Sequence, residues 1–239
     1  MSAAASAEPR FRDGFREWLR AILWAVALWL TIRTFLIEAF RIPSGSMENT
    51  LLPGDMLFVN KAVFGPVVPG LGLRLPAWRE PARGDVLIFD SVERPGEKLV
   101  KRLVGAPGDT LVMRAGVLFR NGRVAPEPYV RHQDLTSTES TETRRRMRQW
   151  QEAHLIGSDS SHYAPDLQDW GPIVVPPESL FVLGDNRDVS YDGRFWGFLP
   201  RANVRGTPLW IYFSYDPEAG ARPPQVFAIR WRRLGTRPR

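Results

Sequence analysis

Cysteine is absent from the 239 residues of this chain. Disulfide bonds, thiol nucleophiles and zinc sites built on cysteine are therefore excluded, and the redox compartment is left undetermined. Histidine is scarce as well. His132, His154 and His162 lie in one polar stretch, and none has metal-ligand spacing relative to another, so we expect surface residues. We predict no metal site and no cofactor.

Lysine occurs only at Lys61, Lys98 and Lys101, although lysine and arginine together number 32. Arginine stays protonated in proteins, whereas a buried lysine can lose its proton and then act as a general base. Lys101 lies in an apolar, alternating segment (99–105) that predicts a half-buried strand. Taken alone, this pattern favours a lysine on an edge strand, where it discourages strand pairing, over a desolvated functional amine.

The net charge of +6 is compatible with binding to nucleic acid or to an anionic membrane surface. Aromatic and basic residues do not interleave in a recognisable nucleic-acid motif, so we predict no nucleic-acid partner. Hydrophobic residues make up 44% of the chain, enough for one sizeable domain or two small ones beside an anchor.

A long apolar run near the amino end covers residues 18–37. It is about one bilayer thick as a helix if Arg20 and Arg33 lie near the interfaces. A cleavable signal sequence is the alternative, but residues 38–42 lack the two small residues that a signal needs at its end. We therefore expect an uncleaved, single-pass anchor. Because arginines precede it, we place residues 1–17 in the cytoplasm and the remainder on the outer face.

Beyond the anchor, short apolar runs separated by glycine and proline predict a mostly β domain. Asn121-Gly122 predicts a tight hairpin, and residues 93–97 predict another turn. The candidate strands are residues 56–60, 85–90, 99–104, 117–119, 180–183 and 209–213.

Residues 131–169 are polar and look like an insertion into the β domain. A short helix is predicted over residues 142–155, started by one of the nearby threonine or serine residues. For its arginine cluster, residues 144–146, a solvated face is favoured over a membrane or partner contact.

Two serines, Ser44 and Ser46, flank a glycine directly after the anchor. Such clusters usually mark turns, and the serines by themselves indicate no more than that. A serine nucleophile needs a neighbouring base, and the histidines are far away in the polar insertion. Lysine is the remaining candidate, because burial could lower its pKa from about 10.4 to near 7 or 8 and let Lys101 accept the Ser46 proton.

Three blocks of the chain together resemble the bacterial type I signal peptidases, a family of serine proteases with a Ser/Lys dyad. They are residues 44–47 (SGSM), 101–109 (KRLVGAPGD) and 184–194 (GDNRDVSYDGR), and they occur in the family's order. The resemblance covers about residues 33–213 apart from the insertion. It implies one transmembrane helix followed by an antiparallel β catalytic domain with a smaller inserted β or irregular subdomain.

The domain limits that we expect on this basis divide the chain into five parts. They are a cytoplasmic segment (1–17), the anchor (18–37), the first part of the catalytic core (38–110), the inserted subdomain (111–178), and the second part of the core with the tail (179–239).

The resemblance also implies roles for single residues. Ser46 is the expected nucleophile and Lys101 the general base, with Ser44 and the Ser46 N–H as the oxyanion hole and Ser190 orienting the lysine. Structural support through ion pairs is expected from Arg102, Asp185, Asp192 and Arg194. The expected substrate-pocket residues are Phe40, Ile42, Met47, Leu57 and Val100.

The implied activity is removal of signal peptides from exported preproteins after small residues (Ala-X-Ala-like), by a monomer at the outer face of the bacterial cytoplasmic membrane. Its expected partners are preprotein signal peptides and membrane lipid. Many family members have proline where this chain has Asn49. A self-cleaving repressor would be soluble, and a β-lactamase-like site would need lysine where Asn49 stands. An anchored β-rich adaptor without activity is the alternative from another class.

Overall fold

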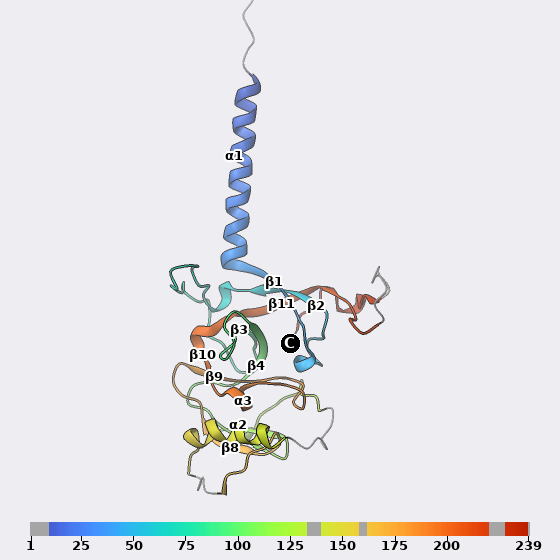
Figure 1. Ribbon diagram of the computed structural model, residues 1–239. Helices are drawn as coiled ribbons and strands as arrows, with labels where there is room; N and C mark the ends of the chain where they lie inside the picture. Colours follow the sequence, from blue (N-terminus) through green and yellow to red (C-terminus); the bar gives the residue numbers. More distant parts are fainter. Residues whose placement is uncertain (1–9, 133–139, 158–161, 220–227, 239) are drawn as a thin grey trace, which may run out of the picture.

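The computed structural model describes residues 10–132, 140–157, 162–219 and 228–238 (Figure 1). Its first helix, α1 (Arg10–Thr31), rises away from the rest of the protein and ends in a π-helical turn, Ile32–Leu36. The segment Gly14–Leu36 is 23 residues long, and none of its most apolar window is buried inside the protein. It is long and apolar enough to cross a membrane. The predicted anchor, 18–37, extends one residue into the first strand.

A larger antiparallel sheet holds seven strands of the described chain, in the order β1-β2-β11-β3-β4-β9-β10. The strands are β1 (Ile37–Arg41), β2 (Asp55–Asn60), β3 (Val86–Asp90), β4 (Lys98–Gly105), β9 (Ser179–Leu183), β10 (Leu199–Pro200) and β11 (Val204–Ser214). The short helix α3 (Gly193–Trp196) follows β9. The mostly β prediction is confirmed. Strand β1 leads directly out of the anchor, so this sheet begins at the base of α1 (Figure 1).

Strand β4 lies inside the larger sheet, because it pairs with β3 on one side and β9 on the other. Residues 101–105 of this strand are all buried, and Lys101 is 4% exposed. The edge-strand interpretation of Lys101 is therefore wrong, and the strand is more deeply buried than the half-buried strand we expected. A lysine on an interior strand cannot discourage the pairing of an exposed sheet edge with another strand. The burial of Lys101 must therefore have another explanation.

A smaller sheet of four described strands, in the order β7-β6-β5-β8, is inserted between β4 and β9 in the chain. Its strands are β5 (Thr110–Arg114), β6 (Val117–Arg120), β7 (Arg123–Val124) and β8 (Trp170–Val174). Asn121 and Gly122 form the predicted hairpin turn, and both have positive φ, as a two-residue turn of type I′ requires. The limits 111–178 for the inserted subdomain stay a prediction.

The expected helix in the insertion is α2 (Thr141–Gln151), continued by a 3₁₀ turn, Glu152–His154. The Ser140 hydroxyl accepts a hydrogen bond from the Thr143 N–H and so satisfies one of the free donors at the helix start. His132 and His162 are exposed, as predicted. His154 differs, because it is half-buried with its ring 5.0 Å from the Phe198 ring.

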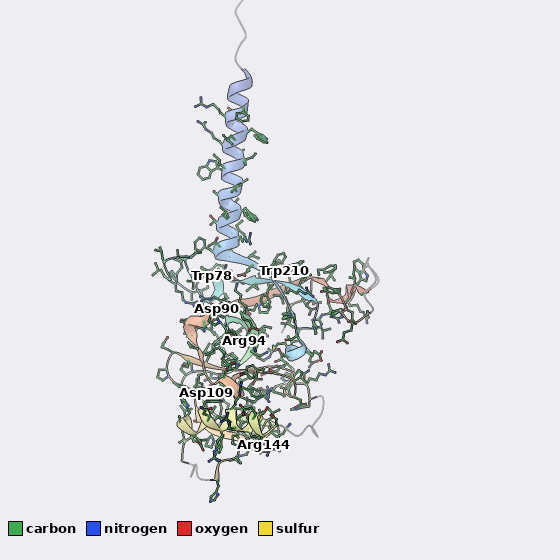
Figure 2. All side chains as sticks on the ribbon, viewed as in Figure 1. Trp78, Asp90, Arg94, Asp109, Arg144 and Trp210 are labelled. Carbon is green, nitrogen blue, oxygen red and sulfur yellow. The ribbon has the colours of Figure 1, made fainter. Side chains whose placement is uncertain are left out.

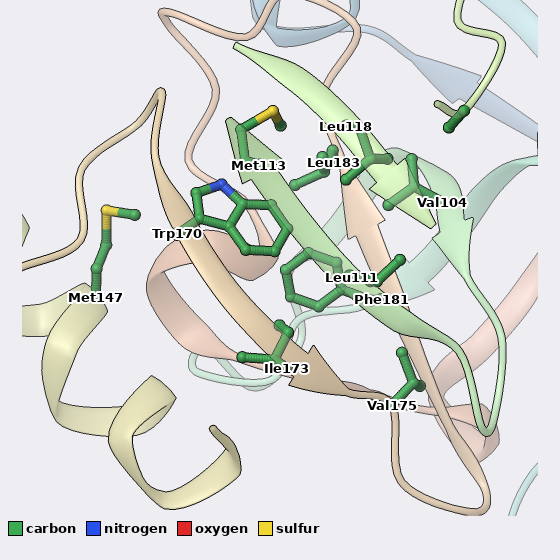
Figure 3. Close-up of a cluster of buried hydrophobic side chains, with 11 residues drawn as sticks. Val104, Leu111, Met113, Leu118, Met147, Trp170, Ile173, Val175, Phe181 and Leu183 are labelled. Carbon is green, nitrogen blue, oxygen red and sulfur yellow. The ribbon is translucent and has the colours of Figure 1, made fainter. Parts of the chain in front are cut away.

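A shared apolar core joins the two sheets (Figure 3). Val104 and Phe181 of the larger sheet pack with Leu111 and Trp170 of the smaller one, and Met147 contributes from α2. This core explains the amphipathic pattern of α2, whose Met147 is fully buried while its arginines face outward. The insertion is therefore packed firmly on the sheet that carries Lys101.

Candidate active site

Ser46 lies in a 3₁₀ turn, Gly45–Met47, shortly after β1. Ser44 is extended, and the turn is closed by a 3.0 Å hydrogen bond from the Glu48 N–H to the Gly45 carbonyl. Met47 is fully buried and anchors the turn in the apolar core, while Ser46 retains 7% exposure. The turn therefore holds the Ser46 hydroxyl at a nearly buried position with a small opening to solvent.

The amine of Lys101 reaches this hydroxyl from β4. Lys101 Nζ lies 2.6 Å from Ser46 Oγ. Burial lowers the pKa of Lys101 from its ordinary 10.5 to about 8; the negative charge of Asp192 partly opposes this shift, and Arg194 adds to it. Near neutral pH a useful fraction of the amine is therefore unprotonated and able to accept a proton.

Ser44 lies at the start of the same turn, and its hydroxyl is close to that of Ser46. Its Oγ lies 3.5 Å from Ser46 Oγ, and its side chain is exposed. The first N–H groups of a helical turn have no acceptor within that turn. The Ser46 N–H belongs to this set, so a hydroxyl and an N–H donor stand next to the Ser46 oxygen.

The loop after β9 packs on the backbone of Ser46. Asn186 donates its N–H to the Ser46 carbonyl at 3.2 Å. A Cβ at Gly184 would lie 2.5 Å from that carbonyl oxygen and 2.1 Å from Ser190 Oγ. Only a glycine fits between the nucleophile's backbone and Ser190 at this position. Ser190 is 4% exposed, and in the described part of the chain its hydroxyl has no hydrogen-bond partner, Lys101 included.

Two buried ion pairs fix this loop. Arg102 donates to both carboxylate oxygens of Asp185, at 2.7 and 2.6 Å, and Thr50 donates to the same carboxylate. Since Arg102 follows Lys101 and Thr50 follows the Ser46 turn, Asp185 links both elements of the site. Such pairs stabilise a geometry only when every buried charge is matched, which bidentate contacts achieve.

The second pair joins Arg194 and Asp192, both fully buried, with two contacts of 2.9 Å. Asp192 also accepts the Gly184 N–H at 2.9 Å. Burial pushes the pKa of Asp192 upward, but the charge and hydrogen bonds of Arg194 outweigh that effect and hold it below its ordinary value. Asp192 is thus a negatively charged carboxylate near Lys101.

The five predicted pocket residues lie together in one apolar cluster between the Ser46 turn and the larger sheet. Ile42, Met47, Leu57 and Val100 are buried, and Phe40 packs against them half-buried. Met47, the residue after Ser46, joins this cluster to the turn that carries Ser46. The cavity that opens at Ser46 and Lys101 is bounded by other residues.

That cavity, which we call the inner cavity, has a volume of about 290 Å³. Its lining comprises Ser44, Ser46, Ser91, Glu93, Arg94, Glu97, Leu99, Lys101, Val189, Tyr191 and Trp196. Among these residues, only Ser44, Ser46 and Lys101 were predicted as site residues from the sequence. Leu99 was open to prediction, since it is two residues before Lys101 and so on the same strand face. No local sequence pattern points to Glu93 or Trp196, because only the folding of the chain brings them to the site.

No group of three or more histidine, aspartate or glutamate residues in the described segments is arranged to hold a metal ion. The chemistry available is that of side chains: a hydroxyl beside a buried amine, with two further donors next to the hydroxyl. A serine activated by a lysine is one of the recognised ways to make a nucleophile for acyl transfer. The site therefore has the composition of a serine hydrolase with a lysine base.

Comparison with known proteins identifies the family. The family model described as signal peptidase, peptidase S26, matches residues 15–213. The chain is 35% identical to a signal peptidase I of Pseudomonas aeruginosa over 81% of this chain and 71% of that protein. It is 32% identical to a signal peptidase I of Leptolyngbya laminosa, over 93% of this chain and 92% of that protein. The chain belongs to the signal peptidase family, peptidase S26, as the sequence blocks predicted.

A crystal structure of a signal peptidase I from Enterococcus faecalis is 27% identical and covers 54% of this chain and 97% of its own. The TM-score of that match is 0.36.

Proposed function

We propose that this chain is a membrane-anchored serine endopeptidase that removes N-terminal signal peptides from exported preproteins, after small residues of the Ala-X-Ala type. One observation carries the proposal: the buried amine of Lys101, with its pKa lowered to about 8, lies 2.6 Å from Ser46 Oγ. Membership of the peptidase S26 family supports the reaction, and the relatives named signal peptidase I support the substrate class.

The reaction proceeds through an acyl-enzyme. Neutral Lys101 takes the proton of Ser46 as Oγ attacks the scissile carbonyl, and the resulting ammonium returns that proton to the departing amine. The Ser44 hydroxyl and the Ser46 N–H donate to the oxygen that becomes negatively charged. Lys101 then takes a proton from a water molecule as that water attacks the ester carbonyl. The resulting ammonium gives the proton to Ser46 Oγ as the bond to the signal peptide breaks, which restores both side chains.

Ser190 and the two ion pairs position these groups. We assign Ser190 to orienting the Lys101 amine, because its buried hydroxyl lies beside Gly184 at the Ser46 backbone. A hydroxyl can accept from the amine without holding its positive charge as a carboxylate would. The pair Arg102–Asp185 braces the loop against the strand that carries the base. The pair Arg194–Asp192 stabilises the loop itself, because Asp192 also accepts the Gly184 N–H.

We assign substrate selection to the apolar cluster of Phe40, Ile42, Met47, Leu57 and Val100. The cluster packs against the Ser46 turn, so bulky residues next to the scissile bond would clash with it. Alanine avoids that clash. Burial of Lys101 in the fold lowers the pKa of its amine.

The anchor gives the site its place relative to the membrane. We assign residues 1–17 to the cytoplasm and the β domain to the outer face of the cytoplasmic membrane, since arginines precede the apolar segment. Ser46 follows the end of this segment, Leu36, by only ten residues. A signal peptide held in the bilayer by its apolar core can therefore reach the site. We also propose that the active enzyme is a monomer in contact with membrane lipid.

The test uses the full chain in detergent or liposomes with a preprotein that ends its signal in Ala-X-Ala. Cleavage after the last small residue, abolished in Ser46→Ala, is the expected result. A peptide-like acylating inhibitor should leave its mass on Ser46, read by mass spectrometry of the digested protein. Binding of the preprotein without cleavage would instead support the inactive adaptor and overturn the proposal.

A further inference from the structure

A second cavity adjoins the inner cavity on the side of the insertion. This outer cavity has a volume of about 450 Å³. Its lining comprises Glu93, Glu142, Arg145, Arg146, Gln149, Trp150, Phe195 and Trp196. Glu93 and Trp196 line both cavities, so a chain bound at Ser46 can continue from one into the other.

Hydrogen bonds hold α2 against the rim of the inner cavity. The Tyr191 hydroxyl donates to Glu93 Oε2 at 2.8 Å and accepts from Arg146 Nη1 at 3.2 Å. Trp150 Nε1 donates to the Arg194 carbonyl at 2.8 Å, which ties α2 to α3, the short helix whose N-cap is Asp192. The insertion therefore forms a fixed wall of the groove, although it supplies none of the groups assigned to the reaction.

The outer cavity lies on the side of the active site that faces away from the membrane anchor. In Figure 1, α1 and α2 lie at opposite ends of the protein, with β4 between them. Figure 2 shows the same order: Trp210 lies near the base of α1, Arg94 in the middle, and Arg144 of α2 at the far end. The apolar core of a signal peptide stays at the membrane, on the α1 side. The substrate chain beyond the cut therefore runs towards α2.

The charges on α2 determine which chain suits this cavity. Within its bounds the helix carries four arginines and a single glutamate, Glu142. Glu142 accepts from both Arg145, at 3.1 Å, and Arg146, at 3.4 Å, while Glu93 is engaged by Tyr191. The two arginines line the cavity, and their side chains are 73% and 53% exposed, so a bound chain can reach their guanidinium groups. Carboxylates are the groups that such guanidinium forks bind best.

We propose that the outer cavity binds the first residues of the mature chain, on the carboxyl side of the scissile bond, and that Arg145 and Arg146 make it prefer acidic side chains there. The inference rests on the proposed function and deepens it. Lysine or arginine at the same substrate positions is repelled by the helix, which weakens binding. The insertion thus makes this enzyme sensitive to the sequence after the cut as well as before it.

The experiment compares two synthetic peptides with the full chain in detergent micelles at low salt. Both carry the same Ala-X-Ala segment, and the next residues are Ser-Asp-Asp in one and Ser-Lys-Lys in the other. We expect kcat/KM to be about three- to tenfold higher for the acidic peptide, from the size of exposed charge interactions, and the ratio to fall as salt rises. Equal values for the two peptides would overturn the inference.

Substitutions on α2 test whether Arg145 and Arg146 cause the preference for the acidic peptide. In Arg145→Gln/Arg146→Gln the ratio should fall towards one, and in Arg145→Glu/Arg146→Glu it should invert. The matched control is Arg148→Gln, which removes the same charge from the same helix outside the cavity lining and should keep the wild-type ratio. An unchanged ratio in the double variants would overturn the assignment. If the wild type cuts neither peptide, the proposed function itself fails, which is a different result.

Discussion

Lys101 Nζ lies 2.6 Å from Ser46 Oγ, although 55 residues separate the two in the chain. The lysine comes from the interior strand β4 and the serine from the turn that follows β1. Because burial lowers the pKa of the amine to about 8, the pair can transfer a proton near neutral pH.

Lys101→Arg should abolish preprotein cleavage while the protein still folds. Arginine keeps the positive charge but has no neutral form at working pH, so no base remains for Ser46. The loss should be at least about 10²- to 10⁴-fold, the usual contribution of a general base. Cleavage kinetics of the purified protein measure it, with circular dichroism as the check on folding.

Lys98→Arg is the matched control on the same strand. Lys98 pairs with Glu38 at the half-exposed end of β4, and an arginine can make that pair as well. Its activity should stay near the wild-type value. Full activity in Lys101→Arg would remove Lys101 from the role of base.

Ser44→Ala should cut preprotein more slowly by a factor of about 10² to 10³, the effect of losing one oxyanion-hole donor. Because Ser44 is exposed, its hydroxyl is not needed for the core, and the melting temperature should change little. The reduction should appear in kcat, since the donor acts on charge that develops in the transition state. An unchanged kcat would exclude Ser44 from the oxyanion hole.

Activity should rise with pH through the titration of Lys101. Below about pH 8 the amine is mostly protonated, so kcat/KM should increase close to tenfold per pH unit and level off above that value. A kcat/KM profile on a short peptide measures the pKa of the free enzyme. A flat profile between pH 6 and pH 10 would contradict the general-base mechanism.

Lys101→Met should make the protein more stable at neutral pH and inactive. The pKa of the amine falls from 10.5 unfolded to about 8 folded, so between these values the unfolded chain holds the extra proton and stability rises with pH. Below about pH 8 the buried charge destabilises the fold by about 3 kcal/mol, which methionine avoids. Urea unfolding at pH 7 and pH 10.5 compares the two proteins.

The gain from Lys101→Met should therefore be largest at pH 7 and should be mostly lost by pH 10.5, where the lysine is neutral in the folded protein and only half protonated in the unfolded chain. Other groups titrate alike in the two proteins and cancel in the difference. An equal or lower stability of the methionine variant at pH 7 would show that Lys101 is not desolvated as the structure indicates.

Gly184→Ala should lose most of its activity, because the added Cβ would lie 2.5 Å from the Ser46 carbonyl oxygen and 2.1 Å from Ser190 Oγ. The backbone under the nucleophile must shift to relieve this contact. Displacements of about 1 Å can reduce rates by about 10²-fold. Cleavage per folded molecule is the measurement.

Gly105→Ala is the control for crowding in general. Its Cβ would lie 2.6 Å from the side chain of Leu111, in the shared core rather than against Ser46. Stability should fall, while the activity of the folded fraction is retained. A Gly184→Ala protein as active as this control would show that the Ser46 backbone tolerates the shift.

Much of the fold was open to prediction from local patterns. The apolar run near the amino end, the Asn121-Gly122 hairpin and the helix capped by Ser140 depend on composition and turn chemistry that act over a few residues. The six predicted strands all coincide with observed strands, because alternating apolar residues mark a sheet face.

Other elements escaped prediction because their signals are not local. Strand β1 merges with the end of the apolar run, and β5 and β8 carry polar or proline residues within short segments. The order of strands in the sheet decided whether Lys101 was at an edge or inside, and strand pairing is set by residues far apart in the chain.

The sequence by itself determined the family and the residue types of the site, because the three blocks carry the serines, the lysine and the paired charges in one order. Only the tertiary structure decided that β4 is interior and that α2 extends the groove beyond the inner cavity. The reason is physical. The identity of a side chain sets what chemistry it can do, but its pKa and its reach depend on what the fold packs around it, as at Lys101.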